Sequence, residues 1–317
     1  MTRPIRAATA ALALVLAAAA CGDDGGTTSD AATGTDGGGE QGSFPVEVEA
    51  VNGPVTIDER PERIVSLSAS HTEMLFAIDA GDQVEAVDEY STYPEEAPVT
   101  DLSGFEPNVE AVASYDPDLV VINYDANDLV AGLDALDIPV IELPAAVNLD
   151  ETYEQIGVLG EATGHPDEAD ALVDDMQSEI QALVDRVPER AEPATYYHEL
   201  DDQLHTATSA TFIGSIYALA GLENIADEAD DGSGFPQISA ELVLDADPDV
   251  IFLADESGGV TPETVAARAG WGDLTAVQEG NVVQLDPDIA SRWGPRIVDF
   301  LRTVVEATAD IEPAAAA

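Results

Sequence analysis

The chain has 317 residues and a formal net charge of −54, from 64 acidic and 10 basic residues, and every basic residue is an arginine. A protein that binds nucleic acid or an anionic bilayer by charge needs a basic face, and so few arginines cannot form one. Because 45% of the residues are hydrophobic, the chain is not a disordered acidic tail; it can bury one large core or two of ordinary size.

The N-terminal segment is typical of an exported protein. Arg3 and Arg6 precede a run of small and apolar residues, 7–20, which ends directly at Cys21. This run is shorter than the about 20 residues that a membrane-spanning helix needs. We therefore expect residues 1–20 to be a secretory signal peptide.

The residues before Cys21 resemble the lipobox of bacterial lipoproteins, because alanines occupy positions 18–20. This resemblance implies that Cys21 becomes the first mature residue and carries lipid, which anchors the protein to the outer face of the cell membrane. The alternative is an ordinary signal peptide with an incidental cysteine, but Cys21 is the only cysteine and has no disulfide partner. Residues 21–43 are rich in Gly, Asp, Thr and Ala, so we expect a flexible tether there.

Apolar segments alternate with helical segments in the first half of the folded part. Four segments have the composition of buried strands: residues 63–67, 84–87, 119–122 and 140–143. Strands that alternate with helices imply a parallel sheet. After the first strand, residues 71–80 predict a helix, with Ser70 and Glu73 as a capping box and Gly81 at the left-handed position that ends it.

A long helix is predicted over residues 166–187, where apolar residues recur at helical spacing and acids occupy the other face. The second half then repeats the alternation of strands and helices. Its predicted strands are residues 195–198, 250–253 and 282–285, and its predicted helices are residues 212–220 and 295–307.

Two segments carry the same pattern, which indicates an internal duplication. In the first, Glu110 precedes an Asp-Pro-Asp turn at residues 116–118; in the second, Glu241 precedes one at residues 247–249. Each glutamate begins a helical segment, and an apolar strand follows each turn. Chance explains one such turn in so acidic a chain, but not the same spacing twice. We infer two lobes of like topology joined by one long helix.

Together these features resemble the cobalamin- and iron-siderophore-type periplasmic substrate-binding proteins, many of them lipoproteins, of ABC importers. The resemblance covers about residues 44–311 and rests on RPERIVSLS at 60–68, the two repeated segments, and RWGPR at 292–296. It implies an α/β fold with two Rossmann-like lobes that have parallel sheets and are joined by one long connecting helix. The implied boundaries are residues 44–163, 164–190 and 191–317.

The resemblance also implies a function. A monomer would capture a metal chelate, either an iron siderophore or a cobalamin-like corrinoid, between its lobes and deliver it to an ABC transporter permease without catalysis. In that family one glutamate at the tip of each lobe contacts arginines of the permease, and Glu110 and Glu241 occupy the matching positions. A carboxylate and a guanidinium form a specific bidentate contact. The alternative is two solvated glutamates that the helix dipole favours.

Ligands of open parallel sheets bind beyond the carboxyl ends of the strands, and several aromatic residues follow predicted strands. The candidates for ligand contact are Tyr90, Tyr93, Phe105, Tyr124, Tyr197, Phe235 and Trp293. Rigid aromatic faces suit a corrin, a haem or an aryl siderophore, although we expect about half of these side chains to cap the cores instead. Where the cobalamin-type relatives present a tryptophan, this chain has Gly104 or Phe105 in one loop and Phe235 in another, which leaves corrin specificity open.

Arg292 and Arg296 flank Trp293 and place two cations in one loop of a very acidic chain. Their position suggests an anionic feature on the ligand, which a pair of guanidinium groups would bind. The family resemblance implies that Asp288 and Arg292 contact the ligand. For Arg296 the alternative is a structural pairing with a nearby acid.

Two other functions remain as alternatives. His71, His198 and His205 lie near predicted strand ends, with Glu199 and Asp201 close by, and a carrier of free zinc or manganese would gather such groups. No tight ligand spacing supports this alternative. A metal-dependent hydrolase is weaker still, because the sequence has no His-Glu-x-x-His, Gly-x-Ser-x-Gly or phosphate-binding Gly-Lys-Ser motif. We expect no cofactor and no resident metal.

The acidic surplus predicts halophilic adaptation. Carboxylates that repel one another destabilise the folded state in dilute buffer, and salt screens this repulsion. We therefore expect the melting temperature, measured by calorimetry, to rise between dilute buffer and molar salt. A melting temperature that does not rise over that range would contradict the prediction.

Overall fold

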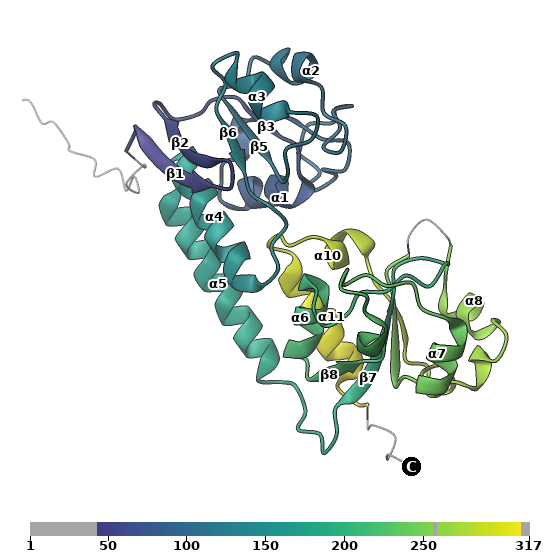
Figure 1. The fold of residues 1–317 in the computed structure, drawn as a ribbon. Helices are drawn as coiled ribbons and strands as arrows, with labels where there is room; N and C mark the ends of the chain where they lie inside the picture. Colours follow the sequence, from purple (N-terminus) through teal and green to yellow (C-terminus); the bar gives the residue numbers. More distant parts are fainter. Residues whose placement is uncertain (1–42, 256–258, 312–317) are drawn as a thin grey trace, which may run out of the picture. The chain divides into compact units, whose positions relative to one another are not determined.

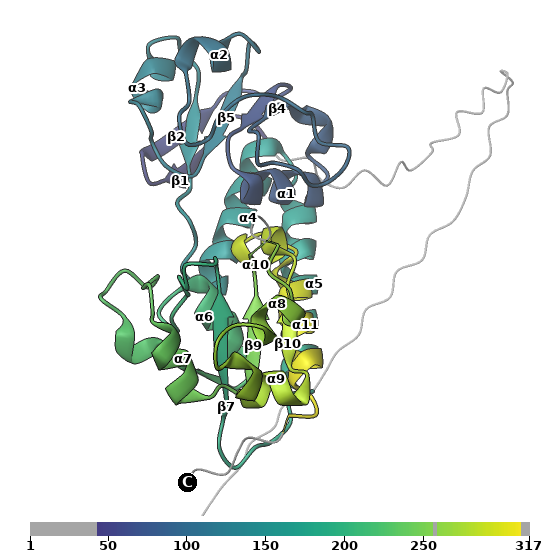
Figure 2. The ribbon, with the colours of Figure 1, turned by 90° about the vertical axis from the view of Figure 1, so that its right-hand side faces the viewer.

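The computed structural model describes residues 43–255 and 259–311, which contain two parallel four-stranded sheets (Figures 1 and 2). The first sheet contains β3 (Ile64–Ser66), β4 (Val84–Val87), β5 (Leu119–Ile122) and β6 (Val140–Glu142). The second contains β7 (Ala194–Glu199), β8 (Leu222–Asn224), β9 (Val250–Leu253) and β10 (Val282–Gln284). The strand orders are β4-β3-β5-β6 and β8-β7-β9-β10. Within each sheet the second strand in the chain is at one edge, followed by the first, third and fourth, so the predicted like topology of the lobes is confirmed.

The N-terminal lobe also contains the antiparallel hairpin β1 (Val46–Ala50) and β2 (Gly53–Ile57), and the helices α1 (Ala69–Ala77), η1 (Gly81–Gln83), α2 (Val109–Ala113), α3 (Leu129–Asp134) and α4 (Leu149–Thr163). The long helix α5 (Pro166–Val184) follows. The C-terminal lobe adds α6 (Phe212–Leu219), η2 (Asp227–Ala229), α7 (Ala240–Ala246), α8 (Pro262–Ala266), η3 (Trp271–Asp273), α9 (Thr275–Glu279), α10 (Pro287–Ser291) and α11 (Ile297–Thr308).

Each sheet is buried on both faces, as its nearly continuous apolar strands predict. In the N-terminal lobe, Val65 and Val120 face a cluster that includes Leu133 of α3, whereas Ile64 and Val121 face α1 and α4. The C-terminal sheet is covered in the same way, by α7, α8 and α9 on one face and by α6 and α11 on the other.

The repeated segments fold alike. In each, a short side chain caps the helix: Asn108 accepts a hydrogen bond from the third residue of α2, and Ser239 from the third residue of α7. The first aspartate of each turn is left-handed, with φ of 53° at Asp116 and 43° at Asp247. The last aspartate of each turn accepts a backbone hydrogen bond from the first strand of the parallel sheet or the residue before it: Asp118 from Arg63, directly before β3, and Asp249 from Thr195 of β7. The duplication read from the sequence therefore extends to the hydrogen bonds.

Helix α5 belongs to the cores of both lobes. Its apolar face buries Met176, Ile180 and Leu183, and it packs against α4 on one side and α11 on the other (Figure 1). Full burial of side chains of this size stabilises a fold by about 1.5–3 kcal/mol each. One apolar cluster consequently runs from the N-terminal lobe through α5 into the C-terminal lobe.

Three local predictions differ from the structure. Helix α5 ends at Val184, before the predicted residue 187, and Pro188 disfavours helical backbone just before it. The predicted capping box is wrong: Ser68 is the N-cap of α1, and Glu73 makes other contacts, which are described below. The left-handed residue after α1 is Asp79, with φ of 62°, and Gly81 instead begins η1.

The predicted signal peptide, residues 1–20, and Cys21 with most of the predicted tether lie outside the described residues. Among residues 43–255 and 259–311, no helix is both long enough and apolar enough to cross a membrane.

Candidate functional site

Two depressions lie side by side where α10 of the C-terminal lobe meets the N-terminal lobe, and they share Ser291 and Trp293 in their walls. The first has a volume of about 360 Å³. It is lined by residues at the carboxyl ends of β3, β4 and β5 together with α10 and the loop that follows it. The predicted position of a ligand beyond the strand ends therefore coincides with a real concavity.

Three aromatic rings form one wall of the first depression. The ring of Phe105 lies 5.3 Å from that of Tyr90, edge to face, and 6.4 Å from that of Tyr124. The exposed fractions are 51% for Tyr90, 60% for Phe105 and 38% for Tyr124. Because the wall keeps so much apolar surface in contact with solvent, it can bury a ligand face.

The floor of the first depression carries a carboxyl group. Asp88 is buried, and burial raises its pKa, although the hydrogen bond from Ser91 and the nearby charge of Arg292 oppose this. Gly104 lies against it, since a Cβ at that position would be 2.6 Å from the carbonyl oxygen of Leu67 and 3.0 Å from Oδ2 of Asp88. The loop therefore has no space for a side chain at Gly104, and the aromatic group it offers is that of Phe105.

The second depression has a volume of about 370 Å³. Its lining comes from the segment after β6, the start of α6, and the loop before α7: Ala145, Ala146, Val147, Ala210, Thr211, Phe212, Ile213, Asp230, Gly232, Ser233, Gly234, Phe235, Ser291 and Trp293. Two large side chains stay exposed at its rim, with exposed fractions of 60% for Val147 and 49% for Phe235.

Trp293 stands between the two depressions. Its indole Nε1–H donates to Oε1 of Gln155 on α4, at 3.0 Å, and its ring meets that of His71 edge to face at 5.9 Å. The side-chain amide of Gln155 donates to the carbonyl of Pro144, which fixes Oε1 as the acceptor. Both contacts of Trp293 cross from the C-terminal lobe to the N-terminal lobe.

Glu73 forms the main ionic contact between the lobes. Its carboxylate, on α1, accepts from Nη1 of Arg292 at 2.8 Å, and from Nε and Nη2 of Arg296 at 2.9 and 2.5 Å. The side chain of Glu73 is only 1% exposed, and those of Arg292 and Arg296 are 9% and 16% exposed. We call these three residues the Glu73 joint.

Further contacts extend the joint. Nη2 of Arg292 donates to the carbonyl of Tyr90 at 2.9 Å and pairs with Asp288 at 2.7 Å. Asp288 in turn accepts from the hydroxyl of Thr92 at 2.9 Å. The guanidinium of Arg296 lies 4.1 Å above the ring of Tyr93, and its hydrogen bonds to Glu73 raise its pKa.

These contacts correct several expected roles. The guanidinium groups of Arg292 and Arg296 are bound to Glu73, which is the structural pairing with a nearby acid that was the alternative for Arg296. Tyr93 supports Arg296 and lines neither depression. Tyr197 is fully buried in the C-terminal core, where its ring meets that of Trp271, so its expected contact with a ligand is wrong. The structure does bring Tyr90, Phe105, Tyr124, Asp288, Arg292 and Trp293 to the first depression and Phe235 to the second.

The other described arginines are also bound within the chain. Each has an acid, a histidine or carbonyl oxygens as its partner: Arg60 with His165, Arg63 with Asp116, Arg186 with Glu306, Arg190 with Ile311 and Thr308, Arg268 with Glu199, and Arg302 with Glu179. In the part of the chain that the structure describes, every arginine therefore has a partner before a ligand arrives.

The histidines do not come together. Nε2 of His71 contacts Gln155, Nδ1 of His198 contacts the hydroxyl of Tyr217, and Nδ1 of His205 contacts Asp201. Over residues 43–255 and 259–311, no three or more His, Cys, Asp or Glu side chains are grouped so that they could hold a metal ion.

Glu110 and Glu241 have equivalent environments. Each is exposed, and each is the second residue of its helix, α2 or α7, directly after a side-chain N-cap. Both carboxylates are therefore accessible to a partner.

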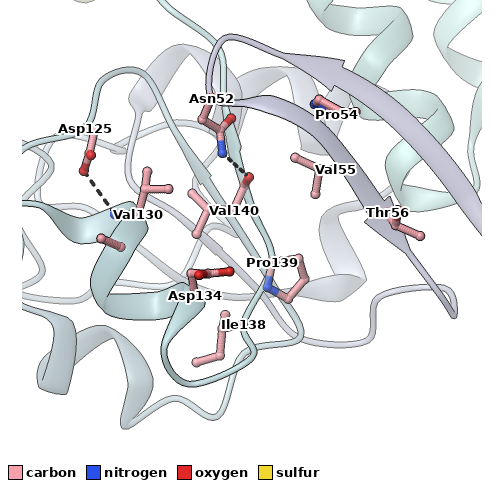
Figure 3. Close-up of a pocket in the computed structure, with 11 residues that line it drawn as sticks. Asn52, Pro54, Val55, Thr56, Asp125, Val130, Asp134, Ile138, Pro139 and Val140 are labelled. Atoms are coloured by element: carbon pink, nitrogen blue, oxygen red, sulfur yellow. Dashed lines mark hydrogen bonds between the residues drawn. The ribbon is translucent and has the colours of Figure 1, made fainter.

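A separate hollow of about 500 Å³ lies in the N-terminal lobe between β2, α3 and the start of β6 (Figure 3). Asn52 donates to the carbonyl of Val140 at 2.9 Å, and Asp125 accepts from the backbone N–H of Val130 at 3.0 Å. These polar groups hold the hairpin and α3 in place, and we assign no ligand to the hollow.

Three residues of the site, Glu73, Gln155 and Asp88, were not predicted from the sequence as site residues. Glu73 is one acid among many, and its partners lie 219 and 223 positions away along the chain, so no local pattern marks it. The one available signal was that two of the chain's few arginines lie beside Trp293, which pointed to the arginines but not to their acid.

Comparison with known proteins identifies the family. The family model described as periplasmic binding protein matches residues 64–289. The chain is 35% identical over 276 residues to a cobalamin-binding protein of Halobacterium salinarum, and the match covers 84% of this chain and 74% of that protein. The chain belongs to the periplasmic binding protein family. It is also 32% identical over 273 residues to the uncharacterized ABC transporter substrate-binding lipoprotein YvrC of Bacillus subtilis, with 83% of this chain and 85% of that protein covered.

Solved structures show the same fold. The vitamin B12 binding protein BtuF of Vibrio cholerae aligns with a TM-score of 0.66 and 27% identity, covering 78% of this chain and 96% of that one. The haem-binding protein RhuT of Roseiflexus sp. RS-1 aligns with a TM-score of 0.70 and 26% identity, covering 78% and 98%. The chain is therefore an extracytoplasmic substrate-binding protein of the ABC-importer type and not an enzyme.

Two buried histidines, His71 beside Trp293 and His198 in the C-terminal core, predict a pH dependence. Burial lowers the pKa of His71 to about 4, although its hydrogen bond with Gln155 acts in the opposite direction. Burial also lowers the pKa of His198, to about 3. In the unfolded chain, where the pKa is 6.5, these imidazoles bind protons first as the pH falls. Their contribution to stability is complete above pH 6.5 and is lost below it as the pH falls towards the folded-state values.

We expect the imidazole NMR signals of His71 and His198 in the folded protein to stay at their neutral positions from pH 8 to about pH 5. In concentrated urea the same signals should titrate near the unperturbed value, which serves as the control. Titration of either imidazole near its unperturbed pKa in the folded protein would contradict its burial.

Proposed function

We propose that this substrate-binding protein captures a cobalamin-like corrinoid between its lobes and delivers it to the permease of an ABC importer. The observation that carries the choice of ligand is the combination of two adjoining, largely aromatic and apolar depressions with arginines that are all bound elsewhere in the described chain. An iron siderophore is the competing ligand.

The size of the site supports a large ligand. The two depressions hold about 360 and 370 Å³ and meet at Trp293, so one molecule that fills both contacts the indole as it passes between them. The apolar edges of a corrin would cover the wall formed by Tyr90, Phe105 and Tyr124, and a bulky substituent would occupy the hollow beside Phe235.

The charge of the site favours a neutral ligand that donates hydrogen bonds. Besides Arg292 and Asp288, the charged groups in the two linings are the carboxyls of Asp88 and Asp230. Asp88 accepts a hydrogen bond from Ser91, and Asp230 accepts from backbone N–H groups and from Thr208, so neither is paired with a cation by these bonds. The cation of Arg292 is neutralised by Glu73 and Asp288. A ferric catecholate carries several negative charges and would meet these acids at close range. A corrinoid carries carboxamide groups, which donate to carboxylate and carbonyl oxygens.

The relatives support the same choice. The protein of Halobacterium salinarum is named as cobalamin-binding, and BtuF of Vibrio cholerae as binding vitamin B12. For the lipid anchor, the support is the sequence around Cys21 and the lipoprotein name of the Bacillus subtilis relative. We include attachment through Cys21 to the outer face of the cell membrane in the proposal.

The ligand is tested by calorimetric titration of the purified protein with cyanocobalamin and with a ferric catecholate siderophore. We expect cyanocobalamin to bind and the siderophore not to bind. Replacing Trp293 by alanine removes the indole that both depressions share, and we expect about tenfold weaker binding, or a loss of roughly 1.4 kcal/mol. Tight binding of the siderophore alone would overturn the choice of corrinoid.

Trp271→Phe is the matched control for the tryptophan change. Trp271 is 1% exposed in the C-terminal core and lines neither depression. We expect this variant to melt earlier because of lost packing but to bind cyanocobalamin with unchanged affinity. Equal loss of affinity in both variants would show that Trp293 has no specific contact with the ligand.

For delivery, we propose that Glu110 and Glu241 dock on arginines of the permease. This docking role is supported by the equivalent positions of the two carboxylates in the two repeats. Each is exposed and is the second residue of its helix, α2 or α7. An exposed carboxylate at a helix start accepts a bidentate guanidinium without further rearrangement.

The double variant Glu110→Gln with Glu241→Gln should lose uptake of cyanocobalamin in cells or proteoliposomes while its ligand affinity stays unchanged. The control removes the same charge from the exposed Glu154 and Glu161 on α4, and this variant should keep uptake. Uptake that survives the first double variant, or falls equally in both, would exclude the docking role.

A further inference from the structure

We propose that Glu73 is a positioning residue of the ligand site, because it holds the loop between α10 and α11 against the N-terminal lobe and so fixes Trp293 between the two depressions. This inference rests on the proposed function for its effect on a ligand. The joint itself can be tested without one.

The Glu73 joint connects the two helices on either side of Trp293. One carboxylate accepts three hydrogen bonds from two arginines that lie on either side of Trp293 in the chain. Arg292 is the C-cap of α10 and Arg296 the N-cap of α11, so the carboxylate bridges the two helices. Trp293 lies in the segment between these helices, and its position follows from theirs.

The Glu73 joint is largely buried. Oε1 of Glu73 accepts from both guanidinium groups, at 2.8 and 2.5 Å, and brings two like charges close together in a place that water barely reaches. Without the negative charge of Glu73 the two guanidinium groups repel each other. The contacts with Tyr90 and Asp288 then remain for Arg292 only. The loop would then move away from α1 to expose them.

The Glu73 joint crosses between the lobes, whereas a chemically similar ion pair does not. Glu199 is fully buried and accepts two hydrogen bonds of 2.6 Å from Arg268, and both residues belong to the C-terminal lobe. Loss of that pair lowers the stability of one lobe without releasing a contact between lobes. It therefore supplies a matched control.

The experiment compares Glu73→Gln, Glu73→Asp and Glu199→Gln in the full-length chain. In Glu73→Gln the amide nitrogen replaces one carboxylate oxygen and faces an N–H donor, so we expect about tenfold weaker binding of cyanocobalamin. Glu73→Asp keeps the charge and should recover part of that loss. Glu199→Gln should melt earlier than the native protein and bind cyanocobalamin with unchanged affinity.

A second readout needs no ligand. Spin labels on cysteines at Ala131 of α3 and Asp245 of α7, both exposed, report the distance between the lobes when Cys21 is replaced by serine. We expect a narrow distance distribution in the native chain and in Glu199→Gln, and a distribution about twice as broad in Glu73→Gln.

Each outcome decides between the claims. If Glu73→Gln keeps both the narrow distribution and the native affinity, the proposal for Glu73 is wrong. If Glu199→Gln broadens the distance distribution or weakens binding as much as Glu73→Gln does, Glu73 contributes only to the overall stability of the protein and does not position Trp293. If the native protein does not bind cyanocobalamin but Glu73→Gln broadens the distribution, the joint holds and the corrinoid proposal fails.

Discussion

The scarcity of cations is the constraint on which this structure depends. A chain with a net charge of −54 and no lysine has few arginines to place, and those in the described part are all used to tie one segment of the fold to another. Two of them meet a single buried carboxylate, Glu73, at the contact between the lobes. Removal of that carboxylate leaves two buried like charges, which is more destabilising than the loss of an exposed ion pair.

The scarcity of cations also determines the charge of the two depressions. Because Arg292 and Arg296 are neutralised by Glu73 and Asp288, the proposed ligand is recognised by aromatic surface, by shape and by hydrogen-bond acceptors. We propose that a site of this kind selects against strongly anionic chelates, since its acids repel them, and favours a neutral molecule with an extended ring system. Selection therefore depends on what the site repels as well as on what it contacts.

Most of the fold could be predicted from the sequence, because the strands, the long helix and the turns each have a local sequence pattern. The strands are short apolar runs, α5 has a clear helical period, and the Asp-Pro-Asp turns mark equivalent places in both lobes. The site was predicted only in part. Phe105 and Trp293 were predicted to lie beyond strand ends, and they line the first depression. Tyr197 was predicted at a strand end for the same reason but is buried, because its place along a strand does not reveal which face of the sheet its side chain takes. Glu73 was taken for a cap because its partners are more than two hundred positions away, a distance over which no periodicity carries information.

The central claim is that a corrinoid occupies a cleft whose cations are bound elsewhere. The most direct measurement is the visible absorption spectrum of the protein purified, without added ligand, from its native host. The account predicts the bands of a corrin, released on denaturation in proportion to the protein. The bands of a ferric siderophore or a haem in that spectrum would contradict it.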